Sequence, residues 1–225
     1  LKGVGPKRAE CYNKLGINTV FDLLNHFPRS YLDFSHPLTI EEASKNNEEA
    51  HAIKGTVVKK LPEARIKKGL SIYKAIFTDN QTDLTIVIYN SEFSFRQLEV
   101  GKEYILYGKI TGNLIRHEIT NPLVLPIDFP DKIQPVYSLT EGLSQNLLRQ
   151  AIHNALLAFN NEIYEPMPKK IMQKYGLCSL NYAMENIHFP KDFHSCEIAK
   201  KRLVFDELLI LQLGMYTLKN RTENS

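Results

Sequence analysis

Residues 82–112, TDLTIVIYNSEFSFRQLEVGKEYILYGKITG, predict a strand, a short helix and a second strand. Successive side chains of a strand point to opposite faces of a sheet, so Tyr89 lies opposite the apolar face of Leu84 and Ile86. Phe93 follows Tyr89 after only three residues. We predict that the two rings form the tip of a barrel and stack on nucleic-acid bases, an interaction worth ~1–3 kcal/mol per base. The alternative is packing at the barrel rim, since most buried aromatic side chains belong to a core.

Strand patterns continue on both sides of this segment. The expected strands cover residues 50–60, 70–79, 84–90, 103–110 and 114–120, with the short helix between the third and the fourth. This is the strand count of an oligonucleotide-binding (OB) fold, a five-stranded barrel that binds through its second and third strands and the loops beside them. We therefore predict an α+β protein whose OB-fold domain covers residues 48–134.

Basic residues gather in and near the first loop between these strands. They are Lys59, Lys60, Arg65, Lys67 and Lys68. Charged runs of this kind usually form a solvated loop, and the residues alone leave the two interpretations balanced. Beside a barrel face that carries Tyr73 and Tyr89, nucleic-acid binding gains support, because phosphates need cations and unpaired bases need flat rings.

The chain begins LKGVGPKRA, in which Pro6 fits the first turn of a helix. The pattern hxGhGxxxA is typical of a helix-hairpin-helix motif, whose glycines let backbone N–H groups approach a phosphate. Gly3, Gly5 and Lys7 are therefore candidate phosphate contacts. The alternative is a compact helical cap in which Gly-Val-Gly is only a tight turn.

A second helix is expected over residues 20–31, capped by Thr19 and with Phe21, Leu24 and Phe27 on one face. A further helical turn is expected over residues 39–44. We assign residues 1–47 to this N-terminal helical segment.

Helical patterns return after the barrel. Residues 135–190 predict a helical linker region, in which Ser144 caps a helix with an apolar stripe and Ser179 caps a shorter one. The last helix, within residues 191–225, is apolar nearly all round in its middle. We expect more protein than this chain contains to bury it. A domain boundary is therefore expected near Lys191.

Composition limits the classes of protein to consider. At 225 residues, with 43% hydrophobic and 24% charged residues, the chain resembles an ordinary soluble protein with a core. The net charge of +3 permits a nucleic-acid partner without requiring one. No apolar run approaches the roughly 20 residues that span a bilayer, so we expect no membrane partner. The sequence starts without a Met and without a signal peptide, so we expect a trimmed chain that is not secreted. Three widely spaced cysteines fit a reducing cytosol, so we expect a cytoplasmic protein.

Motifs for catalysis are absent or incomplete. No GxxxxGK[ST] loop occurs to hold a nucleotide, so Asp206-Glu207, which imitates a Walker-B pair, is better explained as part of a helical stripe. His188, His194 and Cys196 fit no common zinc spacing. We therefore predict no catalytic residue, no metal and no cofactor in this chain.

Several segments together resemble the N-terminal wedge region of the RecG family of bacterial ATP-dependent DNA helicases. They are LKGVGPKRA, TVFDLLNHFPRSYLD, IYNSEF with GKEYILYGK, PVYSLTEGLS with LLRQAI, IHFP and RLVFDELLILQ. Their order and spacing cover nearly the whole chain. The resemblance implies that the motor motifs, with their ATP and Mg²⁺, lie beyond the last helix.

The resemblance also implies a mechanism. The wedge would sit at the branch of a stalled fork or a Holliday junction and split the arms while the motor pulls duplex, which reverses the fork. Tyr89 takes the first aromatic place in the family's F-N-x-x-aromatic stretch, with an added hydroxyl, and Phe93 takes the second. The expected partners are branched DNA and the helicase domains of the same protein. The whole protein is expected to be a monomer associated with the nucleoid. The alternative is an interaction module that docks the motor or a protein partner through the same rings.

Overall fold

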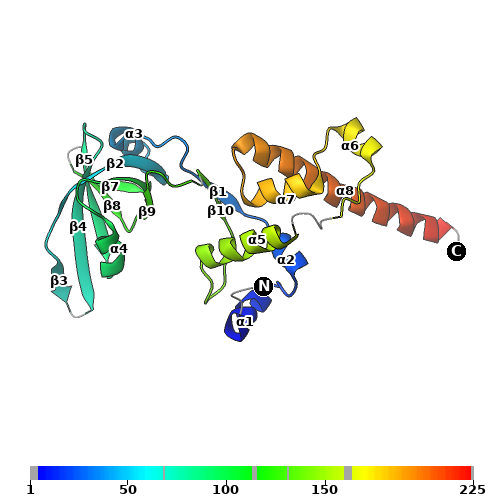
Figure 1. Ribbon diagram of the computed structural model, residues 1–225, viewed down its shortest axis with the longest axis horizontal. Helices are drawn as coiled ribbons and strands as arrows, with labels where there is room; N and C mark the ends of the chain where they lie inside the picture. Colours follow the sequence, from blue (N-terminus) through cyan, green and yellow to red (C-terminus); the bar gives the residue numbers. More distant parts are fainter. Residues whose placement is uncertain (1–4, 68, 113–115, 131, 160–163, 224–225) are drawn as a thin grey trace. The chain divides into compact units, whose positions relative to one another are not determined.

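The computed structural model describes residues 5–67, 69–112, 116–130, 132–159 and 164–223 (Figure 1). Within these residues the chain divides into two compact units. One joins Leu1–Leu32 with Ile133–Ser225, and the other is Asp33–Lys132. The N-terminal helices thus share a unit with the C-terminal ones, which differs from the four consecutive ranges expected from the sequence.

A curled sheet forms the unit of residues 33–132 (Figure 1). Its strands are β2 (His51–Lys60), β3 (Ala64–Lys67), β4 (Leu70–Thr78), β5 (Asp83–Tyr89), β6 (Glu103–Gly108), β7 (Ile110–Gly112), β8 (His117–Thr120) and β9 (Leu123–Pro126). They pair in the order β7-β8-β5-β4-β2-β6-β9, and β3 pairs with β4 beside this path. The expected α+β class is confirmed. The structure has a curled sheet of eight paired strands, where a five-stranded OB-fold barrel was expected.

One face of this sheet forms an apolar core. Leu84, Ile86 and Ile88 alternate along β5 and are buried together with Phe77 of β4 and Leu106 of β6. Two short helices accompany the sheet, α3 (Ile40–Lys45) and α4 (Glu92–Gln97). The helical turn expected over residues 39–44 is therefore present as α3.

The second unit is mostly helical. Its helices are α1 (Pro6–Lys14), α2 (Val20–Leu24), α5 (Gln145–Phe159), α6 (Lys169–Tyr175), α7 (Leu180–His188) and α8 (Phe193–Glu223), and a small sheet pairs β1 (Ser30–Asp33) with β10 (Ile133–Val136). Tyr12, Leu23, Tyr137 and Leu148 belong to one buried cluster, so segments distant in sequence share this core.

The second N-terminal helix is shorter than expected. Thr19 caps α2 through a reciprocal bond pair with Asp22, as the sequence suggested, but the helix ends at Leu24. Pro28 follows closely, and a proline disfavours helical backbone at the residue before it. The expected apolar face is therefore not formed, and the side chain of Phe21 is 73% exposed.

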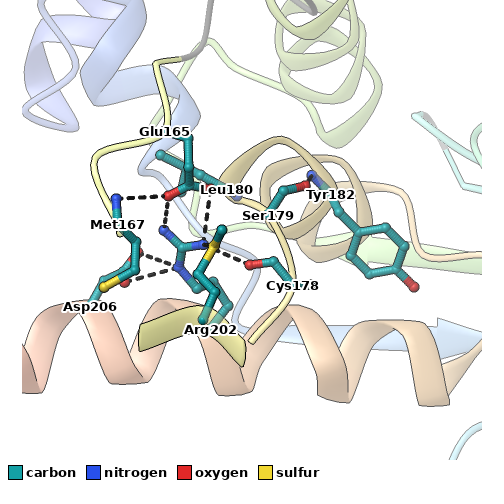
Figure 2. Close-up of polar contacts among 9 residues, drawn as sticks. Glu165, Met167, Cys178, Ser179, Leu180, Tyr182, Arg202 and Asp206 are labelled. Atoms are coloured by element: carbon teal, nitrogen blue, oxygen red, sulfur yellow. Dashed lines mark hydrogen bonds and ion pairs between the residues drawn. The ribbon is translucent and has the colours of Figure 1, made fainter. Parts of the chain in front are cut away.

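Arg202 is fully buried on α8 and joins three segments (Figure 2). Its guanidinium donates to the carboxylates of Glu165 and Asp206 at 2.6 and 3.0 Å. It also donates to the Cys178 carbonyl at 2.6 Å. A buried charge is costly unless it is paired and hydrogen-bonded, and these acceptors meet that need. Asp206 therefore serves the packing of α8 in this structure.

His188 ends α7 inside the helical unit and is fully buried. Its Nε2 lies 2.8 Å from the Leu24 carbonyl oxygen, and its Nδ1 lies 3.0 Å from the Tyr137 hydroxyl. A neutral ring with its hydrogen on Nε2 satisfies both groups, donating to the carbonyl and accepting from the hydroxyl. Loss of solvation on burial lowers the pKa of His188 from 6.5 to about 4.

This burial makes the stability of the helical unit dependent on pH. The unfolded chain takes up the His188 proton near pH 6.5, before the folded chain does near pH 4. Stability is therefore complete above pH 6.5 and falls as the pH decreases towards 4, by up to about 3 kcal/mol. We expect His188→Gln to remove this part of the pH dependence in urea unfolding followed by circular dichroism. A matched change at the exposed His194 should leave it in place, and an equal slope in both variants would contradict the assignment.

Candidate nucleic-acid interface

Tyr89 and Phe93 stand at the end of β5 and at the start of α4. The register of β4 and β5 pairs Tyr89 with Ile72, on the face opposite the core. The Tyr89 ring is 40% exposed and the Phe93 ring 74% exposed. Neither ring is sealed inside the sheet, so both are open to a ligand.

The short helix α4, which carries Phe93, is fixed by one aromatic residue and a cap. Phe95 packs against the core next to Tyr73, with ring centroids 5.2 Å apart. Ser91 caps the helix by accepting the Ser94 N–H. Since Phe95 anchors α4 on its inner side, Phe93 is left on the outer side.

Tyr73 does not belong to the exposed face. The sequence placed it beside Tyr89, which is wrong, because Tyr73 pairs with Ile88 and points into the core. Its ring is only 8% exposed. Successive residues of a strand point to opposite faces, and Tyr89 is one position away from Ile88, the partner of Tyr73, so the two tyrosines lie on opposite faces.

The basic residues divide into different environments. Lys59 is exposed, next to an irregularity in the pairing of β2 with β4. Lys60 turns towards the helix, with its Nζ 4.6 Å from the Phe95 ring centroid, and burial lowers the pKa of Lys60. Arg65 donates to the Glu63 carboxylate at 3.0 Å, so part of its charge is already paired. Lys67 ends β3 opposite Leu70. Lys68 lies outside the described residues.

The N-terminal candidates are less well defined. Gly3 lies outside the described residues. Gly5 precedes α1 with extended backbone, φ −83° and ψ 173°, a conformation that any residue adopts. A Cβ at Gly5 would meet no atom within 4 Å. Lys7 is exposed on the first turn of α1. Neither backbone strain nor packing requires this glycine, so the space beside α1 is open.

One residue that the sequence analysis missed reaches this site from a distant segment. The side-chain oxygen of Asn121 accepts the Tyr89 N–H at 2.9 Å. Asn121 has a positive φ of 45°, a conformation in which asparagine is enriched. The sequence shows only an Asn-Pro pair after an expected strand, which signals a turn but does not name the partner.

Metal sites and membrane-spanning helices are the other features to consider. In the described part of the chain, no cluster of three or more His, Cys, Asp or Glu side chains is placed to hold a metal ion. Across the same residues, no helix is both long and apolar enough to cross a membrane.

Comparison with known proteins identifies the family. Residues 1–159 match the family model described as the RecG wedge domain. The ATP-dependent DNA helicase RecG of Thermotoga maritima is 31% identical over 99% of this chain, and that of Streptococcus pneumoniae is 32% identical over 100% of it. The chain covers 29% and 33% of these two proteins, so it spans about a third of their length.

A solved structure gives the same result. The structure of RecG bound to a three-way DNA junction superimposes with a TM-score of 0.82 at 29% identity, and the match covers 99% of this chain and 31% of the other. With an exposed aromatic pair at the end of a curled sheet and agreement along nearly all of its length, the chain belongs to the RecG wedge domain family.

Proposed function

We propose that this chain is the branched-DNA-binding wedge of an ATP-dependent DNA helicase that remodels stalled forks and Holliday junctions. The observation that carries the proposal is the pair of exposed rings, Tyr89 at the end of β5 and Phe93 at the start of α4. ATP and Mg²⁺ would act in the remaining part of the longer protein, since this chain spans only about a third of its ATP-dependent helicase relatives. The longer protein acts as a monomer.

The pairing of the strands supports an OB-type barrel within the eight-stranded sheet. Five of the strands, β2, β4, β5, β6 and β8, correspond to those expected from the sequence. The first pairs with the second and the fourth, the second pairs with the third, and the third pairs in parallel with the fifth. These pairings support a five-stranded Greek-key barrel, with α4 between its third and fourth strands.

The rings supply a preference for branched DNA. A base is free to stack on a side chain only where it is unpaired, and a fork exposes such bases at its branch. Linear duplex keeps its bases stacked on each other, so it offers only phosphates to the same surface. Exposed rings and nearby cations therefore favour a fork over a duplex of equal length.

We expect Tyr89→Ala with Phe93→Ala to remove the preference for forked over linear DNA in a band-shift titration. The loss per ring is about 1–3 kcal/mol of stacking, or roughly a 5- to 150-fold change in affinity for the fork. Phe21→Ala is a matched control, since its ring is 73% exposed against 74% for Phe93. Equal affinity for fork and duplex in the unchanged chain, unaffected by the double substitution, would refute the proposal.

The basic residues near the sheet supply affinity for DNA that depends neither on the DNA sequence nor on the presence of a branch. We expect Lys59→Gln to weaken binding to fork and duplex alike and to reduce the slope of log affinity against log salt by about 1. Arg65→Gln should have a smaller effect, because Glu63 already pairs with this guanidinium at 3.0 Å. An unchanged slope for Lys59→Gln would show that this residue does not contact phosphate.

A docking role is a second candidate function, and the outer part of α8 favours it. Apolar side chains are exposed around much of this helix, Ile210, Leu213 and Tyr216 among them. Five of them form a stripe with spacings of three and four, and each is more than half exposed: Val204, Leu208, Leu211, Met215 and Leu218. Such a stripe is the typical contact surface of a helix with another helix or domain. The relatives are about three times as long as this chain, so we propose that their helicase domains cover the stripe.

The stripe predicts exposed apolar surface in the 225-residue chain. We expect Leu211→Glu with Leu218→Glu to lower the fluorescence of the apolar dye ANS, because a continuous patch is broken. Val100→Glu is a control of equal exposure, since Val100 and Leu211 are each 57% exposed. Dye fluorescence that responds equally to both variants would argue against a docking stripe.

A further inference from the structure

The last residues of β5 are held from both sides by asparagine side chains. On the β4 side, the Asn90 N–H donates to the Ser71 carbonyl at 2.9 Å, and the Asn90 side-chain oxygen accepts the Ser71 N–H at 2.9 Å. Two residues of an antiparallel pair normally exchange both bonds through their backbones. At Asn90 the side chain replaces the backbone carbonyl as the acceptor.

Asn121 makes the same replacement on the β8 side. The parallel pairing of β5 with β8 extends to Val87 and Thr120. The next residue, Asn121, donates its N–H to the Val87 carbonyl at 2.8 Å, and its side-chain oxygen accepts the Tyr89 N–H at 2.9 Å. In a parallel pair, one residue bonds to the two neighbours of the residue opposite. Asn121 completes this pattern around Ile88 with a side-chain oxygen.

Backbone conformation explains why asparagine serves at both places. Asn90 and Asn121 have φ values of 54° and 45°, so the chain turns away from the sheet at each of them. Asparagine tolerates this left-handed region better than most residues and can hydrogen-bond nearby backbone with its short amide. The two strands therefore diverge while the last backbone donors of β5 keep an acceptor.

We propose that Asn121 is a positioning residue, which fixes the backbone of Tyr89 and so aims its ring at the branch of the DNA. This role rests on the proposed stacking function. Asn121 lies 32 positions from Tyr89 in the sequence, so the bond ties the backbone of Tyr89 to a distant segment outside α4. Without it, the Tyr89 N–H has only solvent as a partner on that side, and Tyr89 is held only by its pairing with β4 and by the bonds between Asn90 and Ser71.

Three variants separate this role from a general loss of stability. Asn121→Gly keeps the backbone conformation but removes the acceptor, since glycine adopts positive φ freely. Asn121→Asp restores an acceptor oxygen. Asn80→Gly is the matched control. Asn80 has a φ of 73° in the turn at the opposite end of β5, and it forms a hydrogen bond there through its backbone N–H, which glycine keeps.

The measurements are amide hydrogen exchange at Tyr89, the ratio of fork to duplex affinity, and quenching of 2-aminopurine placed at the branch. We expect Asn121→Gly to speed exchange at Tyr89, to lower the affinity ratio about fivefold and to reduce the quenching, as for loss of one hydrogen bond. We expect Asn121→Asp to keep the ratio even if its charge weakens both affinities. Asn80→Gly should match the unchanged chain in all three.

The outcomes distinguish the positioning role from the stacking function itself. If Asn121→Gly leaves the ratio of fork to duplex affinity unchanged while Tyr89→Ala lowers it, the positioning role alone is overturned. A ratio that Tyr89→Ala leaves unchanged overturns the stacking function and the positioning role with it. An equal loss in Asn80→Gly also overturns the positioning role. Should Asn121→Gly fail to fold, Asn121→Asp carries the test, and a lost ratio in that variant contradicts the proposal.

Discussion

The site depends on the register between β4 and β5. Pairing Ile72 with Tyr89 and Tyr73 with Ile88 sends one tyrosine outward and the other into the core. Side chains alternate along a strand, so a slip of one residue would bury Tyr89 and expose the core residues of β5. The burial of Leu84, Ile86 and Ile88 therefore fixes the direction of Tyr89. The same apolar contacts that stabilise the sheet also present the ring.

Local signals in the sequence account for the elements that could be predicted. Pro6 and the capping box at Thr19 lie within the helices whose starts they mark, and both starts were located. Tyr89 and Phe93 were recognised because a period of two and a spacing of four residues are visible without the fold. The exposure of Phe93 follows from the packing of Phe95 on the other side of the same short helix.

Longer-range pairing accounts for what the sequence did not reveal. The face of Tyr73 depends on its partner in β5, which periodicity within one strand does not identify. Successive side chains of β2 point to opposite faces, which gives Lys59 and Lys60 different surroundings, although the sequence shows only a basic run. The bond from Asn121 spans 32 positions. An asparagine in a turn has many local explanations, and only the fold selects this one.

The two halves of α8 differ in their surroundings. At its inner half, a buried guanidinium holds Glu165 and Asp206, and breaking a buried pair costs several times more than losing an exposed one. Its outer half carries an apolar stripe that the described residues leave exposed. A 31-residue helix is about 46 Å long, so its two halves lie in different surroundings. The Arg202 network therefore anchors the inner half of α8 more firmly than surface contacts would, while the outer half presents apolar side chains.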